Sequence, residues 1–205
     1  MARDKSPTES RKNKNMGFRS MAASFRAVEG EGNERRMILS FSSETPVRFW
    51  FGVEILDHSP GAIDMSRLEE IGVVLFNHDR NRVLGKILRV WVENGRGHAE
   101  IEFDDDAETE TVFQKVKSGT LRGVSVGYQV QVFEAVKAGV MSVDGRFAGP
   151  CEVARKWMPF EISVASIPAD ATVGVGRELA TAGGGLDVYA RQIQINKNKQ
   201  FIGGQ

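Results

Sequence analysis

Residues 123–132 read GVSVGYQVQV, and this stretch decides the fold class. It has the G-x-S-x-G spacing of a nucleophile elbow, in which a strand turns sharply into a helix directly after the serine. Here apolar and polar side chains keep alternating after Ser125, which predicts a strand. An elbow enzyme also needs an acid and then a histidine after its serine. Because His58, His78 and His98 all precede Ser125, the sequence excludes a lipase or esterase fold.

The rest of the central chain is also rich in strands. Short segments with branched and aromatic residues are separated by Gly, Asn and Pro, which is typical of strands and turns. We expect strands at residues 22–28, 37–42, 47–55, 73–76, 85–92, 98–103, 124–132 and 161–167. The pair Asn94-Gly95 predicts a tight hairpin. The spacing of the strands favours a barrel or a sandwich.

Two helices complete the expected α+β fold. The acidic run Asp104–Asp106 predicts the N-terminus of a helix that ends at Ser118-Gly119. A shorter helix is expected at residues 65–71, with Asp64 as its cap. We therefore predict a strand-rich domain with a few surrounding helices.

The two ends of the chain differ from its centre in composition. Residues 1–20 are polar and basic, and residues 174–205 combine a Gly-Gly-Gly run with Gln, Asn and Lys. Such segments bury too little apolar surface to offset the entropy of ordering, so we predict a disordered basic arm and a flexible tail. A single domain at residues 21–173 remains.

The composition excludes several classes of function. Lys plus Arg equal Asp plus Glu at 27 each, so overall charge indicates neither a nucleic-acid nor a membrane partner. No apolar run approaches the roughly 20 residues of a membrane-spanning helix. Cys151 is the single cysteine, which rules out a disulfide framework. The scattered histidines show no metal-ligand spacing, so we expect no metal and no cofactor.

A serine needs a base to act as a nucleophile near neutral pH, and histidine is the usual one. His78 follows the apolar segment 73–76, and a strand end can hold an imidazole against a serine of another strand. The plainer interpretation is a loop histidine bonded to the backbone. His58 lies in a turn and His98 among charged neighbours, so both are weaker candidates.

Three blocks of the chain resemble a known family. The first is LFNHD at residues 75–79 with VLGKI at 83–87, the second is SGTLRGVSVGY at 118–128, and the third is FEISVASIPAD at 160–170. In this order they resemble the prohead maturation proteases of tailed bacteriophages, which are distantly similar to the herpesvirus assemblins. The resemblance implies an assemblin-like antiparallel β-barrel and a serine endopeptidase.

The resemblance also implies the site residues. Ser125 would be the nucleophile, His78 the base and Glu161 the acid that orients the imidazole, with Asp170 in reserve and Asp79 a poorer partner. The plainer interpretation of Glu161 is a solvated strand position. For the oxyanion hole, the backbone beside Gly123 and Gly127 is unobstructed, and Arg122 could add a donor.

The family further implies partners and a place of action. These are the major capsid protein and the scaffold as substrates, self-cleavage, and the assembling prohead in the cytoplasm of the host bacterium; self-association stays open. Two alternatives remain. One is a shell or scaffold protein with the same fold but no turnover. The other is a serine hydrolase with the order His, Asp, Ser, which would draw its acid from Asp104–Asp106 and lacks a G-D-S-G-G motif.

Overall fold

The computed structural model of the chain describes residues 16–23, 25–49 and 51–166. These residues form ten strands and two helices. The strands are β1 (Met16–Ala22), β2 (Arg26–Ala27), β3 (Arg36–Ser43), β4 (Val47–Phe49), β5 (Gly52–Leu56), β6 (Val73–Phe76), β7 (Asp79–Glu93), β8 (Arg96–Phe103), β9 (Gly123–Val136) and β10 (Cys151–Ala165). The helices are α2 (Ser66–Ile71) and α3 (Ala107–Lys117). None of the helices in these ranges is long and apolar enough to cross a membrane.

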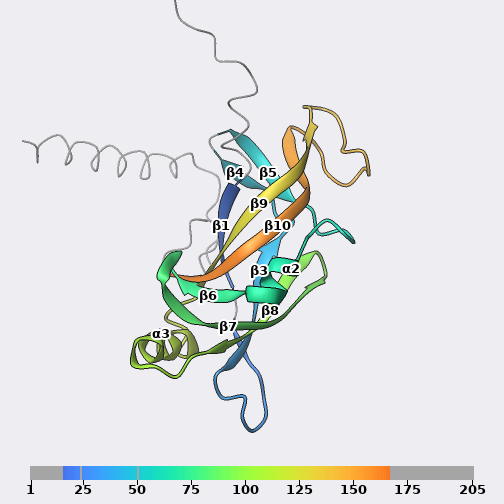
Figure 1. The fold of residues 1–205 in the computed structure, drawn as a ribbon. Helices are drawn as coiled ribbons and strands as arrows, with labels where there is room; N and C mark the ends of the chain where they lie inside the picture. Colours follow the sequence, from blue (N-terminus) through green and yellow to red (C-terminus); the bar gives the residue numbers. More distant parts are fainter. Residues whose placement is uncertain (1–15, 24, 50, 167–205) are drawn as a thin grey trace, which may run out of the picture. The chain divides into compact units, whose positions relative to one another are not determined.

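All ten strands belong to one curled, open sheet (Figure 1). Eight of them follow the order β1-β9-β10-β6-β7-β8-β3-β2, while β5 pairs with β10 and β4 pairs with β5. The strand-rich prediction is confirmed, but a wholly antiparallel sheet is wrong. β10 pairs in parallel with both β5 and β6. The parallel pairs arise because the chain crosses over between these strands, instead of returning through a hairpin.

The core lies on one face of β9 and β10. Val124, Val126 and Tyr128 are at most 1% exposed and alternate with the polar side of β9. Trp157 of β10 is fully buried, and its indole Nε1 donates to the carbonyl of Asp57 at 2.8 Å. Because strand side chains alternate, burying these residues directs Ser125 to the opposite face.

Local signals in the sequence located several elements correctly. Asp106 caps α3, and its carboxylate accepts from the backbone N–H groups of Glu108 and Thr109. Asn94 and Gly95 both have positive φ, as a two-residue hairpin turn requires. The shorter helix is confirmed as α2, but Met65 and not Asp64 is its N-cap residue; Asp64 accepts from the backbone N–H of Ser66.

The structure corrects three expected boundaries. Residues 16–20, which were expected in a disordered arm, form most of β1. The single expected strand at 47–55 is a hairpin of β4 and β5. β10 begins at Cys151, ten residues before the expected start. The rest of the expected arm, residues 1–15, and the expected tail, residues 174–205, lie outside the described residues.

Candidate active site

Ser125 lies in β9 between β1 and β10. It faces Ser20 of β1 and Ser163 of β10 in the strand register, and it is 0% exposed. Its Oγ lies 2.8 Å from Nε2 of His78. Ser125 therefore sits in a regular strand, as its alternation predicts, and its hydroxyl meets an imidazole from another part of the sheet.

His78 occupies the tight turn between β6 and β7. Asn77 and His78 have φ values of 52° and 62°, in the left-handed region that few residues other than glycine adopt. The turn is bound to β10, since Asn77 N–H donates to the carbonyl of Val164 and His78 N–H donates to Ser163 Oγ. This conformation fixes the direction of the imidazole.

Glu161 lies on the other side of the imidazole from Ser125. Its Oε1 is 2.6 Å from His78 Nδ1, and its Oε2 accepts from Ser163 Oγ at 2.7 Å. Glu161 is only 7% exposed, so the plainer interpretation of a solvated carboxylate does not hold. A carboxylate on Nδ1 fixes the tautomer in which Nε2 can accept a proton from Ser125.

Gly127 makes room for this carboxylate. A Cβ on Gly127 would lie 2.6 Å from Glu161 Oε1 and 2.6 Å from the ring of Phe160. Such contacts are too short for a real side chain. Gly127 thus permits the close approach of β10 and Glu161, but its backbone lies between Phe18 of β1 and Glu161 of β10 and is not unobstructed, contrary to the expectation from the sequence.

Gly123 and Arg122 lie at the start of β9. Gly123 pairs with Ala22 on one side and Ala165 on the other. The exposed Arg122 donates from Nε to the carbonyl of Gly119 at 2.7 Å. This bond turns the guanidinium toward the loop that follows α3.

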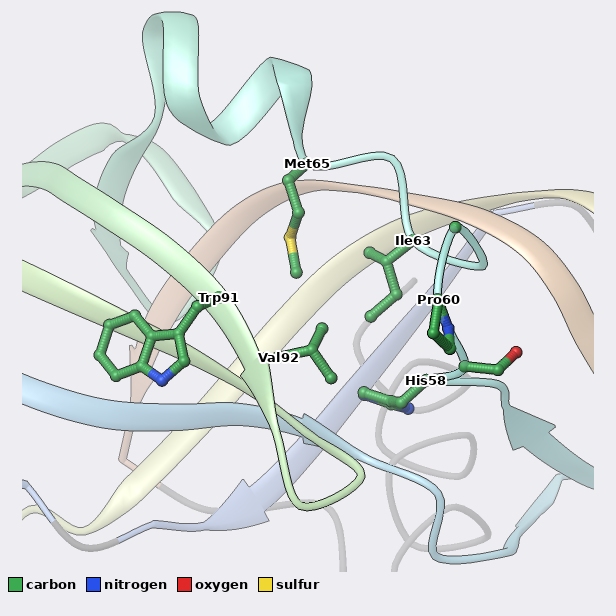
Figure 2. A pocket seen from close by; sticks show the side chains of 8 residues that line it. His58, Pro60, Ile63, Met65, Trp91 and Val92 are labelled. Atoms are coloured by element: carbon green, nitrogen blue, oxygen red, sulfur yellow. The ribbon is translucent and has the colours of Figure 1, made fainter.

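The other two histidines lie elsewhere. His58 is buried, with Nε2 2.8 Å from Ser42 Oγ and Nδ1 2.9 Å from the carbonyl of Leu56. It lines the pocket in Figure 2 together with Trp91 and Val92. His58 is therefore not only a turn residue, as the sequence suggested, but also packs against other side chains. His98 is partly exposed and stacks on Trp91.

The competing acids are engaged elsewhere or not described. Asp79 accepts from the backbone N–H of Asn81, and Asp106 caps α3. Asp170 lies outside the described residues. Within the part of the chain that the structure describes, no group of three or more His, Cys, Asp or Glu residues could hold a metal ion.

Sequence reasoning missed two neighbours of the site, Ser20 and Phe18. Ser20 Oγ donates to Ser125 Oγ at 2.9 Å, and the ring of Phe18 packs edge-on against His78 with centroids 4.6 Å apart. Both belong to a segment whose polar composition hid its strand. Ser163 lies two residues after Glu161, and strand alternation predicts it on the same face, where its Oγ contacts Glu161 and the backbone N–H of His78.

Residues 54–181, more than half of the chain, match the model of the Caudovirus prohead serine protease family. The chain belongs to this family. One similar protein is the "Major capsid protein" of Halomonas phage phiHAP-1, 38% identical over 145 residues. The match covers 68% of this prohead-protease chain and 23% of the phage protein, so the chain spans about a quarter of that relative. No solved structure matches the chain.

Proposed function

We propose that the chain is a serine endopeptidase with Ser125 as nucleophile, His78 as general base and Glu161 as the orienting acid. The observation that carries the proposal is the continuous series of contacts from Glu161 through His78 to Ser125, at 2.6 and 2.8 Å. A nucleophile within hydrogen-bond reach of a base that is itself oriented by a third group is the arrangement that activates a serine. The family match supports the same reaction.

In the proposed reaction, Nε2 of His78 takes the proton of Ser125 as Oγ attacks the carbonyl carbon of a peptide. The carboxylate of Glu161 stabilises the imidazolium formed in this step. His78 then gives the proton to the leaving amine, and a water molecule releases the acyl group from Ser125. As oxyanion donors we propose backbone N–H groups at Gly123 and Gly127, and the guanidinium of Arg122, which would have to leave the carbonyl of Gly119.

For the substrates we propose the major capsid protein and the scaffold of the same phage, cleaved inside the assembling prohead in the host cell. The support is the family description and the printed name of the relative from Halomonas phage phiHAP-1. Self-cleavage, self-association and a fold related to the assemblins belong to the same proposal.

One alternative has a specific observation in its favour. The matched relative is named a capsid protein, which fits a domain of a viral shell without turnover. The two functions differ in the reactivity of Ser125, because a hydroxyl without an effective base does not react with a fluorophosphonate probe.

The test is therefore to incubate the full chain with a fluorophosphonate and to locate the adduct by peptide mass spectrometry. We expect one adduct, on Ser125, that is lost in Ser125→Ala and His78→Ala. Ser42→Ala is the matched control, because Ser42 also lies 2.8 Å from a histidine nitrogen. An adduct that persists in Ser125→Ala favours the structural alternative, and so does the absence of an adduct from a chain in which β1 has been displaced from Ser125.

A further inference from the structure

Ser125 is completely buried, although the proposed nucleophile must reach a peptide. β1 provides much of this cover. It pairs with β9 along seven residues, with Ser20 opposite Ser125 and Phe18 opposite Gly127 (Figure 1). The ring of Phe18 lies against the imidazole of His78. The side of β9 that borders the Ser–His pair is thus occupied by a strand of the same chain.

β1 also competes for the proton of Ser125. The hydroxyl has one proton, and two acceptors lie within reach: Nε2 of His78 at 2.8 Å and the carbonyl oxygen of Arg19 at 3.0 Å. When Ser125 donates to Arg19, it cannot donate to His78. Ser20 adds a donor to the same Oγ at 2.9 Å, which occupies a lone pair of the nucleophile. These contacts with β1 hold the hydroxyl in an unreactive arrangement.

The placement of β1 is that of a bound peptide. Extended peptides bind proteins by adding a strand to the edge of a sheet, with backbone pairing for affinity and side-chain pockets for specificity. β1 adds to the edge of β9 in this way, and it brings a backbone carbonyl, that of Arg19, to the proposed nucleophile. The Ser125 hydroxyl donates a hydrogen bond to the oxygen of this carbonyl, whereas nucleophilic attack would require Oγ to approach the carbonyl carbon. The contact therefore resembles that of a bound peptide and not of a peptide being cleaved.

The side chain of Arg19 fills a buried pocket on the core face. Its Nη2 donates to the backbone carbonyl of Glu54 at 2.7 Å and lies 3.2 Å from the carboxylate of Glu54, while Tyr128 donates to the same carboxylate. Glu54 and Tyr128 are 2% and 1% exposed. A buried carboxylate without a cation is costly, so this pocket favours a basic side chain.

The fit of Arg19 is incomplete. Its Nε is buried and has no hydrogen-bond partner among the described residues. An unsatisfied buried donor reduces the stability of the docked strand. An incomplete fit suits a strand that another peptide can replace.

We propose that β1 is a tethered, substrate-like strand that blocks the active site, and that a substrate takes its place along β9 as an extended peptide with a basic side chain in the Glu54 pocket. This inference rests on the proposed protease function and names the substrate class and the regulation of that site. It assigns to Phe18 and Arg19 the positions that side chains of the substrate would take, and to Gly17 a position that only glycine fits, because a Cβ there would lie 2.5 Å from Tyr128.

The test loosens β1 without touching the proposed catalytic residues. A Cβ on Gly17 would lie 2.5 Å from the Tyr128 ring and hydroxyl, so Gly17→Val pushes β1 away from β9. The measurement is the rate at which a fluorophosphonate modifies Ser125 in the full chain. We expect this rate to rise on the order of tenfold or more, since reactivity scales with the fraction of chains that are open. Met16→Ala is the matched control on β1 because Met16 is 58% exposed, and its rate should equal that of the wild type.

Two further measurements separate an open site from a damaged fold. Phe18→Ala removes a half-exposed ring, so it should preserve the melting temperature and still accelerate labelling by a smaller factor. In the Gly17→Val chain, a synthetic peptide with the sequence of residues 16–22, MGFRSMA, should slow labelling again. The same peptide with glutamate in place of its arginine should not, because it would bring a second carboxylate to Glu54.

The outcomes are distinct from those of the proposed function. Equal labelling rates in wild type, Gly17→Val and Phe18→Ala would overturn the blocking role of β1, whereas no labelling in any of them would contradict the proposed nucleophile. Equal protection by the two peptides would overturn the basic pocket. Faster labelling of Gly17→Val without cleavage of any capsid protein would instead contradict the proposed substrates and leave the role of β1 intact.

Discussion

Among the residues that the structure describes, two serine–histidine pairs have the same separation, and they differ in the group that contacts Nδ1 of the imidazole. Ser125 and Ser42 each lie 2.8 Å from Nε2 of a histidine. Nδ1 of His78 contacts the carboxylate of Glu161, whereas Nδ1 of His58 contacts the backbone carbonyl of Leu56. A carboxylate stabilises a charged imidazolium much better than a neutral carbonyl does. The comparison indicates that the acid, and not the Ser–His distance, distinguishes the proposed reactive pair from the other one.

The two histidines also differ in their exposure to solvent, since His58 is buried in the core and His78 is nearer the surface. His58 is 5% exposed and packs edge-on against Trp157 in the core. Burial lowers the pKa of His58, which keeps its imidazole neutral. The side chain of His78 is 29% exposed and lies in a turn with positive φ. The proposed release of β1 would bring it within reach of a substrate. We therefore expect His78 to take part in proton transfer and His58 to contribute to the stability of the folded chain.

The largest expected effect is that of Ser125→Ala. Loss of the nucleophile should reduce proteolysis by on the order of 10⁶-fold. Ser42→Ala should keep proteolysis but lower the free energy of unfolding by about 1–3 kcal/mol, because His58 Nε2 loses its buried partner. Peptide-cleavage rates and denaturant unfolding of both variants check the contrast. A similar loss of activity in the two would mean that the pairs do not differ as described.

Substitutions of the two histidines, His78 and His58, should differ in the same way as those of the two serines. His78→Ala should abolish turnover and change stability little, while His58→Ala should retain turnover in the fraction that folds. His98→Ala removes a ring that stacks on Trp91 and not on a residue of the site, so this variant should retain both. Activity per folded molecule, measured with circular dichroism as the reference for folding, decides this. Comparable losses in all three variants would indicate a structural effect.

Glu161→Gln should have an intermediate effect. The amide keeps the size of the side chain but no longer stabilises the imidazolium, so turnover should fall on the order of 10⁴-fold and remain measurable. Gly127→Ala should act on the same contact by displacing Glu161, whose Oε1 would lie 2.6 Å from the new Cβ. A Glu161→Gln chain with wild-type turnover would show that the acid is not part of the mechanism.

The smallest expected effect is the contribution of His58 to the pH dependence of stability. Its pKa is lowered in the folded state, so below about pH 6.5 the unfolded chain binds a proton that the folded chain does not. Stability from this group is complete above that pH and decreases on acidification, by at most about 1.4 kcal/mol per pH unit. Melting temperatures between pH 7 and 5 should decrease less steeply in His58→Gln. An unchanged slope would contradict a buried neutral His58.

The sequence predicted those elements whose signals lie within a few neighbouring residues. β6, the Asn94-Gly95 turn and α3 follow from apolar runs, turn chemistry and a capping carboxylate, all readable within a few residues. β1 did not, because its stability comes from the edge of β9 and from the contact of Arg19 with Glu54, 35 residues away in the chain. The early start of β10 was hidden by Lys156 and Pro159, which a register shift after Pro159 accommodates.

The same division applies to the candidate site. Alternation predicted a strand at Ser125 in place of a nucleophile elbow, and the resemblance suggested His78 and Glu161 as the partners of this serine. The distances between the three depend on how β6, β9 and β10 pair, which sequence spacing does not encode. Ser20 and Phe18 could not be predicted, since a segment expected to be disordered offers no reason to look for contacts with a nucleophile.

The most direct test of the central claim is to coexpress the chain with the major capsid protein of its phage and to analyse the capsid protein by intact mass spectrometry. We predict a shortened capsid protein with the wild-type chain and with Ser42→Ala, and a full-length one with Ser125→Ala. A capsid protein that is shortened equally with Ser125→Ala would contradict the account.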